Sequence, residues 1–154
     1  SLVETKDGDL VAFMRTGEME GRAAVARSRD RGKSFEPWQD AGFRGFPQDV
    51  IRLRDGRIFV VYGYRFEPFG VRARVLAPDA RDTATAAEII LRDDGGSGDL
   101  GYPWAVELPS GEILTVYYIN TATPASDPKA AQESFHATHG SGSERIIAGT
   151  LLAP

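Results

Sequence analysis

The chain has 154 residues, of which 42% are hydrophobic and 26% are charged, and its formal net charge is −4. This balance is typical of one globular domain, and the intermixed charges exclude the basic surface of a nucleic-acid-binding protein and the polybasic run of a protein that binds anionic membranes. The sequence contains no cysteine, which excludes disulfides and thiolate metal sites. No apolar run is long enough to cross a membrane.

The first predicted unit opens with a turn at Gly8, followed by a β-rich run over residues 10–15. A second run covers residues 21–27, and a short run around 35–39 closes the unit. The polar segment between these last two runs is Ser28–Phe35, SRDRGKSF.

This segment has the spacing of a self-capped turn, the Asp-box pattern Ser-x-Asp-x-Gly-x-Thr/Ser-Trp/Phe. Ser28 and Asp30 are expected to bond nearby backbone groups, and Gly32 permits a left-handed backbone. The Phe35 ring is expected to pack between sheets. We predict a structural role for these four residues and no catalytic one.

The second unit repeats the pattern around a turn at Gly56. Its β-rich runs cover residues 50–53, 58–62, 70–76 and 88–91. Residues 83–90 are rich in alanine, but flanking β-branched residues favour a strand at the end of that segment.

The third unit turns at Gly111, and its runs cover residues 105–108, 113–117 and 145–152. The three turn glycines are 48 and 55 residues apart. Units of about 50 residues with four antiparallel strands are typical of β-propeller blades. We therefore predict an all-β fold with about three four-stranded blades, at about 1–42, 46–92 and 100–154, the last without its fourth strand.

Three stretches carry a family resemblance: GRAAVARSRDRGKSF, RDGRIFVVYGYRFEPFGVRARV and LRDDGGSGDLGYPWAVELPSGEILTVYY. The chain resembles the C-terminal half of a bacterial sialidase (neuraminidase) with Asp-box (BNR) repeats, along essentially its whole length. The resemblance implies a six-bladed propeller, an acidic carbohydrate ligand, glycoside hydrolysis without a cofactor, and a secreted or periplasmic location.

The resemblance also implies roles for individual residues. Sialidases hold the substrate carboxylate with three arginines, because a guanidinium fork matches a carboxylate and stays charged. Arg15 matches the second of these arginines, and Arg65 and Arg72 compete as matches for the third. Tyr102 matches the tyrosine nucleophile, an exception among glycosidases.

The predicted blade geometry places blade-to-blade loops and the loops after each second strand on one face. Arg15, Arg65 and Tyr102 should therefore meet at one rim, opposite the Asp box. A competing interpretation of Tyr102 is that it only positions its strand, since Tyr102-Pro103 repeats the aromatic-proline pair Phe46-Pro47.

Several alternatives stay open. The family's catalytic glutamate would precede Ser1, so we expect the 154-residue chain to be inactive. A non-catalytic carbohydrate- or protein-binding propeller is the alternative function. The open end of the blade stack would be completed by a missing N-terminal half or by a homodimer. We expect no metal site, and interpret the pair His136 and His139 as part of a polar loop and Asp99 as a turn cap.

Overall fold

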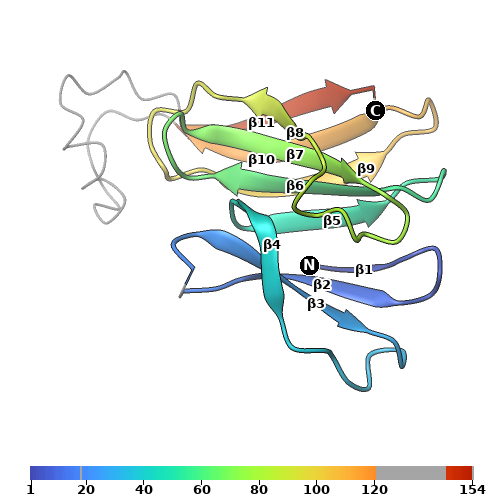
Figure 1. The fold of residues 1–154 in the computed structure, drawn as a ribbon. Coiled ribbons are helices and arrows are strands. Elements are labelled where there is room, and N and C mark those ends of the chain that lie inside the picture. The colour runs from blue at the N-terminus through green and yellow to red at the C-terminus, as the bar shows by residue number, and fades with distance from the viewer. Residues whose placement is uncertain (18, 121–144, 154) are drawn as a thin grey trace.

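A computed structural model describes residues 1–17, 19–120 and 145–153. Within this part of the chain the structure has eleven strands and no helix (Figure 1). The strands are β1 (Leu2–Glu4), β2 (Leu10–Arg15), β3 (Arg22–Ser28), β4 (Gln39–Arg44), β5 (Gln48–Arg52), β6 (Ile58–Tyr64), β7 (Gly70–Leu76), β8 (Glu88–Arg92), β9 (Gly101–Glu107), β10 (Ile113–Asn120) and β11 (Arg145–Leu152).

The strands form three antiparallel sheets in chain order. Sheet 1 has the order β1-β2-β3-β4, sheet 2 has β5-β6-β7-β8, and sheet 3 has β11-β10-β9 within the described residues. The first two strands of each sheet join through a tight turn whose glycine has positive φ: 86° at Gly8, 93° at Gly56 and 89° at Gly111. The predicted all-β architecture of antiparallel hairpins is confirmed.

Sheet 2 lies between the other two sheets, and alternation along its strands fills both interfaces (Figure 1). On β6, Val60 and Tyr62 belong to the core shared with sheet 1. Phe59 and Val61 belong to the core shared with sheet 3. Successive side chains of a strand point to opposite faces, so a continuous apolar run is what a strand buried on both sides requires.

The closing strand of the first unit is displaced from its expected position. The strand expected around residues 35–39 begins only at Gln39 and continues to Arg44. It contains Gly42 in a positive-φ conformation, and glycine gives little strand signal. In the alanine-rich segment, residues 83–85 form a turn and the strand begins at Glu88, which confirms the strand predicted at the end of that segment.

The Ser28–Phe35 loop closes on itself through side-chain hydrogen bonds. The Ser28 hydroxyl donates to Asp30 Oδ1 at 2.8 Å and accepts from the Gly32 amide at 2.8 Å. Asp30 also accepts from the Ser34 hydroxyl and amide, and these bonds, led by the Ser34 hydroxyl, lower the pKa of Asp30 to about 2. The loop is a self-capped turn, as its spacing predicts.

Phe35 corrects one part of that prediction. Its side chain is 43% exposed and does not pack between sheets. Trp38, which follows in the same connection, is exposed as well. Both residues lie in the connection between β3 and β4, outside the strands of sheet 1.

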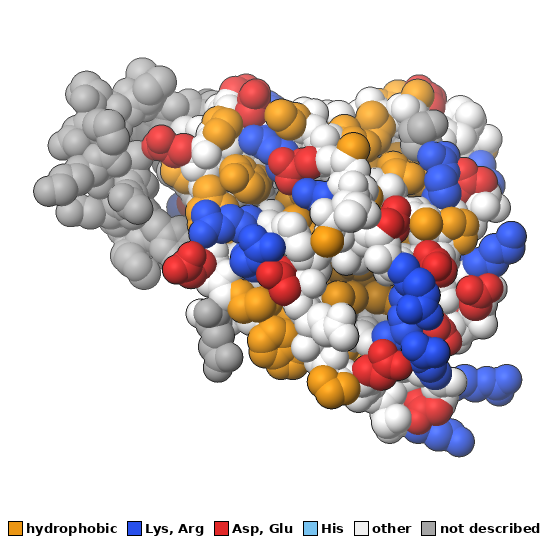
Figure 2. Space-filling model, in the orientation of Figure 1, with side chains coloured by type: hydrophobic (Ala, Val, Ile, Leu, Met, Phe, Trp, Pro, Cys, Tyr) orange, Lys and Arg blue, Asp and Glu red, His pale blue; other side chains and the backbone are white. Residues whose placement is uncertain are grey.

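Acidic and basic side chains lie intermixed on the face in Figure 2, without an extended area of one sign. No helix that could span a membrane occurs among the residues that the structure describes.

Candidate functional site

The predicted site residues Arg15, Arg65 and Tyr102 meet at one rim of the sheets. Arg15 is the last residue of β2, Arg65 directly follows β6, and Tyr102 is the second residue of β9. Phe46 lies between them, in the connection from sheet 1 to sheet 2. We call Arg15, Phe46, Arg65 and Tyr102 the rim cluster.

Cation–aromatic contacts hold the rim cluster together. The Arg15 guanidinium carbon lies 4.2 Å from the centroid of the Phe46 ring. The Arg65 guanidinium carbon lies 5.5 Å from the Phe46 centroid and 5.6 Å from the Tyr102 centroid. Each arginine at the end of a second strand therefore lies over the aromatic residue that opens the next sheet. Such contacts orient a guanidinium while leaving most of its donors free.

Arg65 is the best-positioned cation of the cluster. Its Nε donates to the carbonyl of Leu100 at 2.9 Å, which fixes the plane of the guanidinium. Its Nη2 is buried and has no hydrogen-bond partner among the residues that the structure describes. Unpaired buried donors are uncommon, and each one calls for a partner that a water or a ligand oxygen can supply.

Tyr102 is exposed and its backbone is in an unusual conformation. The side chain is 60% exposed, and φ is 46°, in the left-handed region that non-glycine residues rarely adopt. Its ring stacks on Tyr118 with centroids 6.0 Å apart. In contrast Phe46, the aromatic of the corresponding aromatic-proline pair, is buried. The two pairs share a sequence pattern but not an environment.

A carboxylate network lies next to Tyr102. The Tyr118 hydroxyl donates to Asp99 Oδ1 at 2.8 Å, and the Arg145 guanidinium binds Asp99 Oδ2 at 2.6 Å. Burial and the bond to Asp99 raise the pKa of Tyr118 to about 12. Burial alone would raise the pKa of Asp99, but hydrogen bonds from Tyr118 and Arg145 outweigh it and leave that pKa below its usual value. Asp99 is thus an ionised anchor rather than a proton donor near neutral pH.

This network was not predicted from the sequence. Asp99 was expected to be a turn cap, and neither Tyr118 nor Arg145 was an expected site residue. Alternation on β10 identifies Tyr118 as facing away from the sheet interior. No local pattern indicates that Arg145, 46 positions later, reaches the same carboxylate.

Arg72 lies apart from the rim cluster. It is only 3% exposed, and its guanidinium stacks on Tyr64 at 4.7 Å. It donates to the carbonyls of Pro68 and Arg92. These bonds tie β7 to the neighbouring connection, so in this geometry the donors of Arg72 serve the fold and do not face a ligand.

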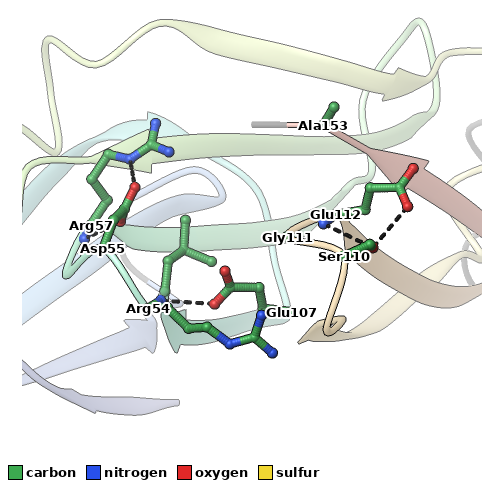
Figure 3. Close-up of a pocket in the computed structure, with 9 residues that line it drawn as sticks. Arg54, Asp55, Arg57, Glu107, Ser110, Gly111, Glu112 and Ala153 are labelled. Carbon is green, nitrogen blue, oxygen red and sulfur yellow. Dashed lines mark hydrogen bonds and ion pairs between the residues drawn. The ribbon is translucent and has the colours of Figure 1, made fainter.

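The opposite rim carries a pocket of about 370 Å³ between the turns of sheets 2 and 3 (Figure 3). Glu107 accepts from the Arg54 amide at 2.8 Å, and Asp55 binds Arg57 at 2.6 Å. Ser110 donates to Glu112 at 2.9 Å. Because its charged side chains are already paired, this pocket is a junction between turns and a weaker candidate for binding.

Within the described ranges, no group of three or more His, Asp or Glu side chains is placed to hold a metal ion. His136 and His139 lie outside the described residues.

No family model matches the chain, and no curated protein matches it. Among solved structures, a protein of unknown function from Dyadobacter fermentans DSM 18053 is 43% identical, with a TM-score of 0.81. That match covers 98% of this chain and 36% of the Dyadobacter chain. The chain therefore spans little more than a third of that relative.

A second solved structure is the GH93 α-L-arabinofuranosidase of Fusarium graminearum in complex with arabinobiose. It is 14% identical with a TM-score of 0.57, and the match covers 96% of this chain and 42% of that one. At this identity the likeness shows the fold alone. It supports a β-propeller arrangement for the three sheets and leaves the number of blades open.

Proposed function

We propose that the rim cluster recognises the carboxylate of an acidic sugar, as part of a sialidase-like glycoside hydrolase. The observation that carries this proposal is the convergence of Arg15 and Arg65 on the Phe46 ring, with Tyr102 beside them. Two guanidinium groups provide charge and paired donors for a carboxylate. The unpaired Nη2 of Arg65 is the donor with the clearest need for a partner.

The aromatic residues suit the rest of a sugar. The exposed ring of Tyr102, stacked on the partly buried ring of Tyr118, offers an apolar face to the C–H groups of a pyranose, while the arginines fix its orientation.

In the intact protein, the phenolic oxygen of Tyr102 bonds the anomeric carbon as the glycosidic C–O bond breaks. The leaving oxygen takes a proton from an acid supplied by further chain, and water then hydrolyses the bond between the sugar and Tyr102. A phenol is favoured there because a carboxylate nucleophile would be repelled by the substrate's own carboxylate. A carboxylate from outside these residues takes the phenolic proton, since Asp99 is engaged by Tyr118 and Arg145. Arg72 as a third sugar contact stays a prediction that its burial does not favour.

The proposed architecture of the intact protein is a six-bladed propeller. The 154-residue chain supplies blades at about 1–42, 46–92 and 100–154. Further chain or a second copy supplies the remaining blades. The glycoside-hydrolase neighbour supports the architecture, and its sugar specificity carries no weight for this chain.

The second candidate function is a non-catalytic sugar-binding propeller. One observation favours it: within the described residues, the carboxylate nearest the stacked tyrosines bonds Tyr118 and not Tyr102. Binding without turnover requires only the arginines and rings.

Two measurements separate these candidates. Calorimetry with N-acetylneuraminic acid against galactose tests recognition, and hydrolysis of a chromogenic sialoside tests catalysis. For the 154-residue chain we expect binding of the acidic sugar only, with no turnover. Equal affinity for both sugars would refute the proposed recognition, and turnover at ordinary enzyme rates would refute the expected inactivity.

A further inference from the structure

The outer face of sheet 3 is apolar and exposed. We define it by the side chains that point away from sheet 2: Trp104, Val106, Leu114, Val116, Ile147 and Leu151. Trp104 and Ile147 are each 75% exposed, and Val106 is 51% exposed. Large contiguous apolar patches on a protein surface mark interaction sites.

The internal repeat shows which side chains of sheets 1 and 2 are equivalent to those on this face of sheet 3. Residues three and five positions after the turn glycine are Val11 and Phe13 in sheet 1, and Phe59 and Val61 in sheet 2. All four are fully or almost fully buried, each pair against the next sheet in the chain.

The same two positions in sheet 3 are Leu114 and Val116, and Val116 is 38% exposed. The position five residues before the turn glycine behaves in the same way. There Val3 is buried, whereas the corresponding Val106 is exposed. Sheet 3 therefore repeats the face with which sheets 1 and 2 each pack against the next sheet in the chain.

In both existing interfaces, the sheet that packs over this face also presents the same kinds of side chain. It carries apolar residues two positions after the turn glycine, Ile58 and Ile113, and a tyrosine six positions after it, Tyr62 and Tyr117. Each tyrosine hydroxyl bonds within its own sheet, to Glu88 or to Thr150. A sheet can therefore present a buried tyrosine to its neighbour without an unsatisfied hydroxyl.

We infer that the outer face of sheet 3 is a docking surface for a further antiparallel sheet of this same repeat type, supplied by protein chain beyond these 154 residues. Continuity with the two existing interfaces argues for a sheet as the occupant. The relative that matches almost the whole chain extends well beyond the matched region, which leaves room for such a sheet. This inference rests on the propeller architecture proposed above, for which it selects further chain over a second copy, and it does not depend on sugar recognition at the rim.

The test compares this chain with the longer Dyadobacter protein. In the 154-residue chain, Val116→Asp should change the melting temperature by less than about 2 °C, because the site is open to water. The same change at the aligned residue of the Dyadobacter protein should lower it by about 5 °C or more, because a charge would then be buried. Ser110→Asp on the exposed turn of the same hairpin, made in both proteins, is the matched control.

A second readout needs no variant. Hydroxyl-radical footprinting, normalised to the free peptides, should show the peptide around Trp104 unprotected in the 154-residue chain and its aligned peptide at least about fivefold protected in the longer protein. Equal labelling of the two peptides, together with a change of less than about 2 °C in the melting temperature of both aspartate variants, would overturn the inference. So would a stable homodimer of the 154-residue chain that Val116→Asp dissociates, since the occupant would then be a second copy.

Discussion

The two rims of the sheets use charge in opposite ways. At the rim of the hairpin turns, charged side chains bond neighbouring turns: Arg54 donates to the Leu108 carbonyl at 2.8 Å, and Glu107 caps the Arg54 amide. At the other rim, Arg15 and Arg65 lie over aromatic rings, and Arg65 keeps a buried donor without a partner. Polar groups at the first rim join neighbouring turns. At the other rim Asp99 is paired, but the guanidinium groups of Arg15 and Arg65 keep donors available. We therefore expect substitutions at the first rim to alter stability and substitutions at the second to alter binding.

The largest expected effect is on ligand binding, from Arg65→Gln. This variant removes the positive charge and part of the donor fork, so affinity for N-acetylneuraminic acid should fall at least about 10-fold, equivalent to about 1.4 kcal/mol. Calorimetry measures it, with Arg57→Gln at the opposite rim as the matched control. An equal loss in both variants would mean that net charge, rather than the rim cluster, determines affinity.

Arg54→Ala should lower stability without changing sugar affinity, the reverse of what is expected for Arg65→Gln. Loss of the bond to the Leu108 carbonyl should lower the free energy of unfolding by about 1 kcal/mol in urea denaturation, while sugar affinity stays unchanged. Lys33→Ala in the exposed Ser28–Phe35 loop serves as the control. If Arg54→Ala weakened sugar binding and left stability intact, the contrast between the rims would be reversed.

A smaller and pH-dependent effect is expected for Asp99→Asn. The pKa of Asp99 lies below its usual value in the folded chain, so its ionised form stabilises the fold above the unfolded-state pKa of about 4. The wild-type advantage should be below about 1 kcal/mol at pH 7 and should disappear as the pH falls through the folded-state pKa. Urea denaturation at a series of pH values measures this. An advantage that grew on acidification would contradict the assigned charge state.

The smallest effect is spectroscopic. Tyr118→Phe should remove a tyrosinate absorbance step near pH 12, and Asp99→Asn should move that step to lower pH because the acceptor carboxylate raises the pKa of Tyr118. Ultraviolet titration detects both changes. An unchanged step in Asp99→Asn would show that burial alone sets this pKa.

The sequence was informative wherever structure depends on local chemistry. Glycines at the hairpin turns, alternation along β6 and the spacing of Ser28, Asp30 and Gly32 each impose a conformation through neighbouring residues. The rim placement of Arg15, Arg65 and Tyr102 followed from repeat geometry.

Features that depend on distant partners could not be predicted in this way. The bond between Arg145 and Asp99 joins positions far apart in the chain, and the exposure of Phe35 depends on tertiary packing rather than on the spacing within its loop. Strand β4 was displaced because Gly42 and Asp40 carry little strand propensity, and pairing with β3 overrides it. Arg72 illustrates the same limit, since only tertiary contacts distinguish an arginine that binds backbone carbonyls from one that faces a ligand.

The most direct test of the account is calorimetry of the 154-residue chain with N-acetylneuraminic acid and with its methyl ester. The ester keeps the sugar and removes only the negative charge of the carboxylate. We predict measurable binding of the acid, at least about 10-fold weaker binding of the ester, and loss of this discrimination in Arg65→Gln. Equal affinity of the wild-type chain for acid and ester would contradict carboxylate recognition by the rim cluster.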